Sequence, residues 1–298
     1  MNQGWTYRDQ ISQGGQTVLQ YYVQRYQHSS KHEWRERIQR GQVQVNDRPV
    51  SPETLLKSGD LLIYHRPPWE EPSVPLSFGV LYEDDDVVAV DKPSGLPVMP
   101  GGGFLEHTLL HQLQLRYPDR VPIPIHRLGR GTSGIVLSAR SPQAKSSLSQ
   151  QMRDRSLSKI YRTLIERADL PDAFSINTPI GPVPHPYLGT VFAANDRGKD
   201  ARSDCRVLRR SHDSTLLEVD ILTGRPHQIR IHLASIGYPL LGDPLYISGG
   251  SVRLGDSAET TPVPGDCGYD LHAHRLIFTH PESQRRIAVE APLPPELI

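Results

Sequence analysis

The chain has 298 residues with 33 basic and 33 acidic side chains, so its formal net charge is zero. A hydrophobic content of 37% is enough for a buried core, and the length fits one large domain and one small domain. Zero net charge argues against a uniformly basic nucleic-acid binder, so any such surface must be local. The two cysteines cannot form a disulfide framework, no apolar stretch approaches the roughly 20 residues of a membrane helix, and the N-terminus has no signal pattern. We therefore expect a cytoplasmic chain with no membrane contact.

The N-terminal quarter of the chain predicts a small folded unit over residues 16–65. Thr17 can cap a first helix with apolar residues at helical spacing, and a second helix is predicted over Ser30 to Arg40. Short strands are predicted at Val43 to Val45 and at Leu61 to Tyr64. Two helices with a small sheet are near the lower size limit for independent folding.

The stretches on either side of this unit have a different composition. Residues 1–15 are polar and rich in Gly and Gln, which predicts a flexible arm, and the prolines within 66–77 predict an interdomain linker. A second domain is expected over 78–298. It opens with two short strands joined by an acidic turn at 83–86, and its Pro- and Gly-rich stretch 175–200 predicts a long loop.

The N-terminal pattern resembles a known RNA-binding module. The second helix ends in Arg-Gly-Gln-Val-Gln-Val-Asn, and Ser-Gly-Asp-Leu-Leu follows, as in the alpha-L module of a small-subunit ribosomal protein and of many RNA-modifying enzymes. Basic residues outnumber acidic ones between residues 8 and 48. Charge alone favours a solvated helix face, but the module pattern favours contact with RNA phosphates, with Arg35 and Arg40 among the expected contacts.

A polar, glycine-rich turn at 126–134 leads directly into the apolar run Ile135 to Leu137. This pattern predicts a loop at the mouth of a buried strand, where catalytic groups are common. Ser141-Pro142 then predicts the start of a helix with one buried stripe. Between His126 and Arg162 basic residues greatly outnumber acidic ones, which predicts a local phosphate-binding face.

The run Thr223 to Leu233 alternates polar and apolar residues and predicts a strand. On a strand, Gln228, Arg230 and His232 would share one face and the apolar residues the other. The Ser-, Gly- and Pro-rich stretch 247–268 predicts an inserted loop before a further strand.

Together these segments of residues 78–298 resemble the RluA-type family of RNA pseudouridine synthases. The matching pieces are Lys92-Pro93-Ser94-Gly95, His126-Arg127-Leu128, Thr132-Ser133-Gly134, Lys159-x-Tyr161, Thr223 to Leu233, Pro239 to Asp243 with Tyr246, and Leu271-His272-Ala273. The resemblance implies an α+β pseudouridine synthase fold, with a central mixed, mainly antiparallel sheet and flanking helices and loops. It also implies isomerisation of a flipped-out uridine in structured rRNA or tRNA, with no metal and no cofactor.

The resemblance also assigns roles to residues. Tyr161 corresponds to the family's tyrosine that stacks on the target base and is its candidate proton acceptor. Arg230 corresponds to the arginine that pairs with the nucleophilic aspartate, Ile229 to the apolar wall beside the base, and Arg127 to the group that fills the space left by the flipped base. The remaining residues expected at the RNA or the base are His126, Arg130, Thr132, Ser133 and Gln228.

The sequence departs from the family pattern at the nucleophile. Gly129 follows His-Arg-Leu where the family has aspartate, and glycine has no side chain that could attack. Three explanations are open: another carboxylate reaches the site, the protein binds RNA without isomerising it, or the chemistry uses water or substrate groups. Asp91, Asp154 and Asp243 are the candidate carboxylates. We expect an enzyme, with a catalytically silent RNA-binding factor in ribosome or RNA assembly as the alternative.

Other site types fit less well. Gly131-Thr132-Ser133-Gly134 is followed by Ile135 where a serine-hydrolase elbow needs its second glycine. His272 and His274 could share a strand face near Cys267, but structural histidines are the favoured interpretation, and we expect no metal. The chain is expected to be a monomer.

Overall fold

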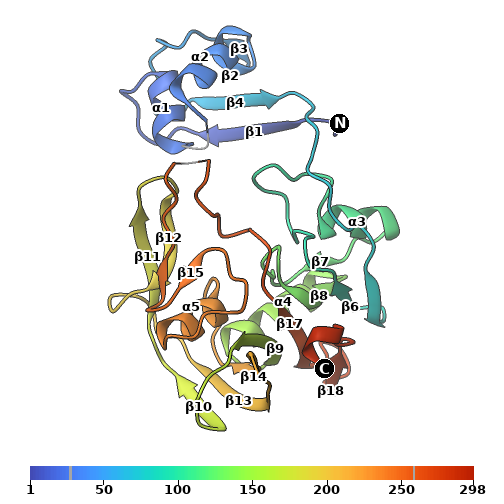
Figure 1. Cartoon of the computed structure of the whole chain (residues 1–298). Helices are drawn as coiled ribbons and strands as arrows, with labels where there is room; N and C mark the ends of the chain where they lie inside the picture. Colours follow the sequence, from blue (N-terminus) through green and yellow to red (C-terminus); the bar gives the residue numbers. More distant parts are fainter. Residues whose placement is uncertain (27–28, 258) are drawn as a thin grey trace. The chain divides into compact units, whose positions relative to one another are not determined.

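The computed structural model describes residues 1–26, 29–257 and 259–298. The chain divides into two compact units, Met1–Glu71 and Pro72–Ile298 (Figure 1). No helix among the described residues has the length and apolar character needed to cross a membrane.

Two helices and an antiparallel sheet form the first unit. Helices α1 (Val18–Arg25) and α2 (Lys31–Gln39) begin after Thr17 and Ser30, and each cap hydroxyl accepts a hydrogen bond from the backbone N–H three residues on. The sheet has the order β1 (Trp5–Gln10), β4 (Leu61–Arg66), β2 (Val43–Val45) and β3 (Arg48–Pro49). The predicted helices and strands of this unit are confirmed.

The prediction of a flexible arm at 1–15 is wrong, because β1 lies within it. Trp5 stands opposite Arg66 and Gln10 opposite Leu61, so β1 pairs with β4 along its whole length. Four of its six side chains are polar, and Trp5 and Tyr7 are 50% and 40% exposed, so this edge strand is held mainly by its backbone hydrogen bonds and has no buried apolar face to reveal it. The order also extends into the predicted linker, where the Asn2 side-chain amide donates to Glu71 at 2.7 Å.

A mixed, mainly antiparallel sheet of ten strands is the centre of the second unit, as the α+β prediction requires. Its order is β10 (Ala173–Ile176), β13 (Ser203–Arg210), β14 (Ser214–Ile221), β9 (Ser158–Glu166), β17 (Leu271–Thr279), β8 (Ser133–Ala139), β6 (Val87–Lys92) and β5 (Gly79–Glu83), with β18 (Arg286–Glu290) on β17 and β7 (Ile123–Pro124) on β8. The β17 and β8 pair is parallel, and it places His272 opposite Ser133 at the start of β8.

Apolar side chains cover both faces of this sheet. On β6, Val88 and Val90 belong to one core, whereas Val87 and Ala89 belong to the other. Helix α4 (Pro142–Arg153), capped by Ser141, packs on the second face through Ala144 and Leu148, which confirms the predicted stripe. The other helices are α3 (Leu109–Arg116), α5 (Gln228–Ser235) and the 3₁₀ turn η1 (Pro295–Leu297).

The stretch 175–200 is not one long loop. It holds the end of β10 and a two-stranded ribbon of β11 (Ile180–His185) and β12 (Gly189–Ala194). Two prolines in β11 suggested a loop, but a two-stranded ribbon leaves alternate N–H groups unpaired, so it tolerates proline. The predicted inserted loop 247–268 is confirmed except for a short pair, β15 (Tyr246–Ile247) with β16 (Ser251–Val252).

The strand predicted over 223–233 is wrong as well, because residues 228–235 form α5, which lies beside β15 (Figure 1). All residues from Gln228 to Ala234 are buried. Polar and apolar alternation indicates a strand only when polar side chains face water. Here Gln228 and His232 share one side of the helix, where both bond to the Ser203 hydroxyl, whereas Arg230 points away to Asp243, so the predicted common face of all three does not exist.

Candidate active site

The predicted loop at 126–134 leads into β8, and a buried ammonium group holds its backbone. The Lys92 Nζ donates to the carbonyls of Pro93 and Leu96 at 2.8 Å and to the Arg130 carbonyl at 3.3 Å. Burial lowers the pKa of Lys92 to about 7. The Thr132 N–H closes the turn on the Gly129 carbonyl at 3.1 Å. The loop is therefore fixed from within the fold.

An aromatic ring, Tyr269, lies next to two of the three glycines of this loop, Gly129 and Gly131. A Cβ at Gly129 would lie 3.4 Å from the Tyr269 hydroxyl and 3.5 Å from the Thr132 hydroxyl, which are ordinary contacts. A Cβ at Gly131 would lie 3.0–3.1 Å from the Tyr269 ring and hydroxyl. Neither glycine has a left-handed backbone. A side chain at Gly131 would therefore press on Tyr269 and require the ring to shift by a few tenths of an ångström, whereas a Cβ at Gly129 would not.

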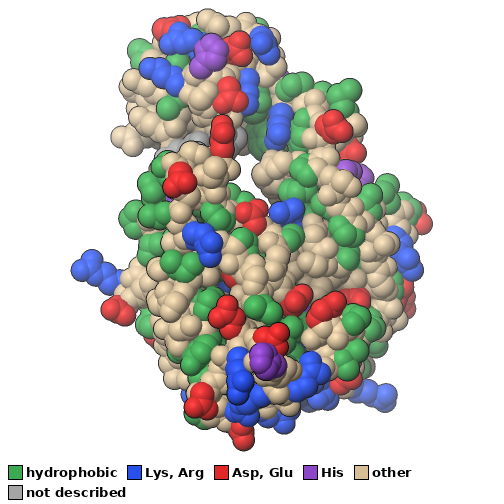
Figure 2. Space-filling view, in the orientation of Figure 1, with side chains coloured by type: hydrophobic (Ala, Val, Ile, Leu, Met, Phe, Trp, Pro, Cys, Tyr) green, Lys and Arg blue, Asp and Glu red, His purple; other side chains and the backbone are tan. Residues whose placement is uncertain are grey.

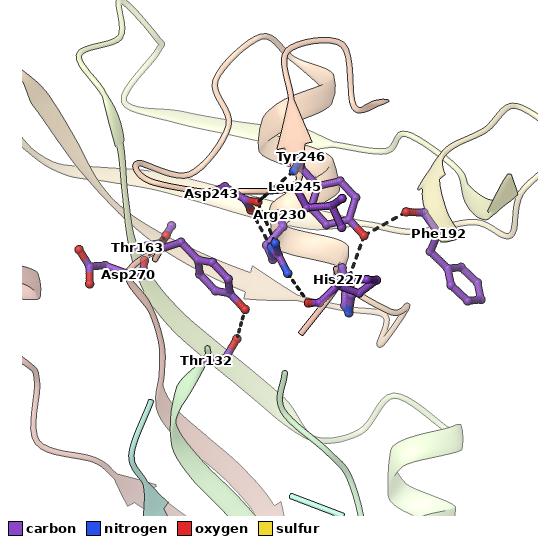
Figure 3. A network of polar contacts seen from close by, with 11 residues as sticks. Thr132, Thr163, Phe192, His227, Arg230, Asp243, Leu245, Tyr246 and Asp270 are labelled. Atoms are coloured by element: carbon purple, nitrogen blue, oxygen red, sulfur yellow. Dashed lines mark hydrogen bonds and ion pairs between the residues drawn. The ribbon is translucent and has the colours of Figure 1, made fainter. Parts of the chain in front are cut away.

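Arg230 projects from α5 beneath this ring. Its Nε and Nη2 donate to the two carboxylate oxygens of Asp243 at 2.6 and 2.7 Å, and its Nη1 donates to the Pro264 carbonyl at 2.9 Å (Figure 3). Its guanidinium carbon lies 4.2 Å from the centre of the Tyr269 ring and 4.8 Å from that of Tyr246. The charge of a residue that is 2% exposed is therefore compensated within the protein.

Asp243, one of the three candidate carboxylates, accepts hydrogen bonds at both of its oxygens. Besides Arg230, its Oδ1 accepts from the backbone N–H groups of Leu245 and Tyr246, both at 2.9 Å, and its side chain is 0% exposed. Such a carboxylate is a counter-charge rather than a nucleophile. The pKa of Asp91 is raised by burial. No contact places Asp91 or Asp154 at Arg230.

A close backbone approach links Asp243 to Tyr269. Gly242 has φ +76° and Gly268 has φ +125°, and a Cβ at Gly242 would lie 2.0 Å from the Gly268 carbonyl oxygen. Only glycine allows this approach. The two chain segments that meet here carry the counter-charge and the ring that flank Arg230.

The apolar wall of the site combines residues from four segments. Leu128, Tyr161, Ile229 and Tyr269 belong to one core cluster and are each less than 9% exposed. Burial raises the pKa of Tyr161 well above its usual value, so its hydroxyl is neutral in the free protein. The structure therefore brings Tyr161, Ile229 and the 126–134 loop into one cluster.

Several residues predicted to contact RNA are instead bonded within the protein. The His126 Nε2 accepts from the Leu137 N–H at 3.0 Å, and burial lowers the pKa of this histidine to about 4. The Gln228 side chain bonds to Thr223 and to the Arg202 carbonyl, at 2.6 and 2.8 Å. Ser133 pairs with His272 at 2.9 Å and Thr132 lies 3.4 Å from the Tyr269 hydroxyl. Of the residues predicted at the base, Arg127 has the exposed side chain.

Three of the eight basic side chains of the predicted basic face between 126 and 162 form ion pairs within the protein. Arg130, Arg140 and Arg162 pair with acids from other segments at 3.7, 3.1 and 3.2 Å. Figure 2 shows acidic side chains interspersed with the basic ones. A charge count along the sequence missed these pairs, because the acids Asp266, Glu83 and Glu218 lie outside the span that was counted.

In the first unit, the two arginines predicted to contact phosphate lie on and directly after α2. Arg35 pairs with Glu53 at 2.9 Å and Arg40 with Glu36 at 3.5 Å, and all four side chains are at least 41% exposed. Exposed pairs of this kind are weak, so both arginines can exchange their partners for phosphate.

Tyr269 was not predicted as a site residue. It follows the loop 247–268, and no local pattern distinguishes it from the chain's other tyrosines. The sequence did not decide which carboxylate pairs with Arg230, and the structure shows that it is Asp243. Within the described ranges, no group of three or more His, Cys, Asp or Glu side chains could hold a metal ion.

A family model and curated relatives identify the same family, and a solved structure shares the fold. Residues 86–235 match the family model described as RNA pseudouridylate synthase. A Synechocystis protein described as an uncharacterized RNA pseudouridine synthase is 51% identical, over 94% of this chain and 95% of its own length. Ribosomal large subunit pseudouridine synthase D of Neisseria meningitidis is 36% identical, over 87% and 71%. The solved human RNA pseudouridylate synthase domain containing 1 shares the fold, with a TM-score of 0.58 at 22% identity over 77% of this chain and 89% of that one. The chain therefore belongs to the RluA-type family of RNA pseudouridine synthases.

Proposed function

We propose that this protein isomerises uridine to pseudouridine in a structured RNA, either rRNA or tRNA. The Neisseria relative is named for the large ribosomal subunit, and both rRNA and tRNA offer folded substrates with uridines that can be flipped out. Detachment at N1, rotation and reattachment through C5 require an apolar pocket for the base and a positive group near the reacting sugar.

The observation that carries this proposal is that Arg230 is buried and fully paired with Asp243. A buried guanidinium is costly unless it is paired, and Asp243 compensates it although Gly129 cannot. The arginine therefore does not depend on substrate phosphate to remain buried. It stays beside Tyr269, and Tyr161 and Ile229, which we propose to contact the base, lie in the same cluster as that ring.

Tritium release tests the proposal directly. Uridine labelled with tritium at C5 loses the label to water when C5 forms the new glycosidic bond. We expect release from RNA of cells that lack the protein, because their target uridine is unmodified, and little release from RNA of wild-type cells. Equal release from both RNAs, or none from either, contradicts the proposal.

A catalytically silent RNA-binding factor is the alternative function, and Gly129 favours it. The position lacks a nucleophile, and the bonds around Asp243 leave that carboxylate no free oxygen. Such a protein would bind the same RNA but release no tritium. Comparing pseudouridine positions in RNA from cells with and without the protein separates the two functions and identifies the uridine.

The first unit supports RNA binding in either case. We propose that α2 contacts the RNA backbone through Arg35 and Arg40, which exchange exposed carboxylate partners for phosphates. Within the second unit, exposed Arg127 is the candidate to enter the space vacated by the flipped base.

A further inference from the structure

The missing nucleophile leaves a specific place in the site, next to Gly129 and near Arg230. The Tyr269 hydroxyl borders that place. It lies 3.4 Å from the position of a Gly129 Cβ, within contact range of a side chain there. Gly131 leaves room for the ring. The Cβ of an alanine at this position would lie 3.0–3.1 Å from the ring and hydroxyl of Tyr269.

The surroundings of this hydroxyl suit an oxygen that carries negative charge during a reaction. Thr132 lies 3.4 Å away, within hydrogen-bond distance, and can donate to it. The Arg230 guanidinium carbon stands 4.2 Å from the ring centre. A cation held against a phenol ring stabilises its phenolate form, whereas burial of the ring at 5% exposure opposes it. No carboxylate other than Asp243 lies within salt-bridge distance of Arg230 in the described chain.

We propose that Tyr269 is the catalytic nucleophile of this protein and takes the place of the family aspartate. This inference rests on the proposed isomerase function. Tyrosine is one of the side chains that form covalent intermediates in enzymes, and here the hydroxyl rather than the ring would be essential.

The reaction balances with solvent as the proton reservoir. The phenol first loses its proton to water, and the phenolate oxygen bonds to C1′ of the uridine as the C1′–N1 bond breaks, with its electron pair remaining on the uracil ring. After the ring turns, C5 attacks C1′, and the C1′–O bond breaks with its pair returning to the phenolate. C5 then loses its proton and N1 gains one, so the product is an isomer of the substrate.

Four proteins test this assignment by tritium release from C5-labelled RNA of cells that lack the protein. They are the wild type, Tyr269→Phe, the double variant Gly129→Asp/Tyr269→Phe, and the control Tyr82→Phe, which removes a hydrogen-bonded phenol hydroxyl in the other core of the same unit. Thermal unfolding and RNA binding verify that each is folded.

We expect Tyr269→Phe to lose at least about a hundredfold in kcat with RNA binding unchanged. Tyr82→Phe should retain activity. The double variant should regain activity, because a carboxylate then stands at position 129 with room beside the phenyl ring. Wild-type activity in Tyr269→Phe, or an increase on removing the ring with Tyr269→Ala, overturns the assignment and makes the ring a plug of the pocket.

The pH dependence provides a readout that a structural role would not affect. Burial raises the pKa of Tyr269, so the reactive phenolate fraction should grow about tenfold per pH unit between pH 7 and 9. The double variant should be insensitive over this range, since its carboxyl group is ionised throughout. A wild-type rate that does not change between pH 7 and 9 contradicts the inference. An inactive wild type overturns the isomerase function itself, whereas an active Tyr269→Phe overturns only the inference.

Discussion

Replacing Asp243 by asparagine removes one charge from an ion pair whose side chains are 2% and 0% exposed. Arg230 keeps its charge, because a guanidinium is not deprotonated in proteins. The amide offers one acceptor oxygen where the carboxylate offered two, and four donor groups converge on that carboxylate. Its NH₂ group must then face a donor. We expect the substitution to destabilise the second unit by roughly 3–5 kcal/mol.

Differential scanning calorimetry measures the effect. For a domain of this size each kcal/mol lowers the unfolding midpoint by roughly 2–4 °C, so the midpoint should fall by roughly 6–20 °C. Glu53→Gln is the matched control for an exposed pair and should cost less than about 1 kcal/mol.

The double variant Arg230→Met/Asp243→Asn decides whether the loss comes from the stranded charge. It should recover most of the stability, because it removes the unpaired charge while the amide oxygen can still accept from the N–H groups of Leu245 and Tyr246. A loss of less than about 1 kcal/mol for Asp243→Asn would refute the reasoning, since Arg230 would then have another counter-charge or access to water.

Three further predictions follow from contacts in the structure. Gly131→Ala should cost about 1–3 kcal/mol in urea unfolding because its methyl group presses on the Tyr269 ring, whereas Gly129→Ala should cost less than about 1 kcal/mol; equal costs would contradict the packing. The free energy of unfolding should be highest above about pH 6.5 and fall toward pH 4. Burial holds the pKa of four histidines at about 4 in the folded chain, whereas in the unfolded chain they take up protons below about pH 6.5. Urea unfolding that gives the same free energy at pH 7.0, 5.5 and 4.5 would exclude this. These histidines are His126, His227, His232 and His272. Finally, Arg35→Ala/Arg40→Ala should weaken RNA binding, make the affinity less dependent on salt concentration, and cost less than about 1 kcal/mol in stability. A salt dependence in filter binding equal to that of the wild type would show that these arginines do not contact RNA phosphates.

Local rules predicted the elements that local interactions determine. Thr17, Ser30 and Ser141 start their helices because their hydroxyl groups satisfy N–H groups three residues on, which depends only on nearby residues. The apolar runs of β6 and β8 are likewise evident, because both faces of the sheet are covered. Family motifs then located the loop at 126–134.

Other features depend on partners far away in the sequence. β1 is held by β4, α5 buries its polar side chains against several segments, and Arg162 finds its acid on another strand. None of these partners is visible in a local window. The same holds for the site, where Asp243 was a candidate by neighbourhood but its bonds to Arg230 required the fold.

The contact between Tyr269 and Gly131 also bears on how such a site can change during evolution. A side chain at position 131 would be in tight contact with this placement of the ring, at 3.0–3.1 Å, and the chain segment before the ring packs closely on Gly242. A protein that changes only one of these positions should therefore be less stable than one that keeps them all. The glycines and the tyrosine are expected to be inherited together, so the residue at 269 should be noted whenever a relative carries glycine at 131.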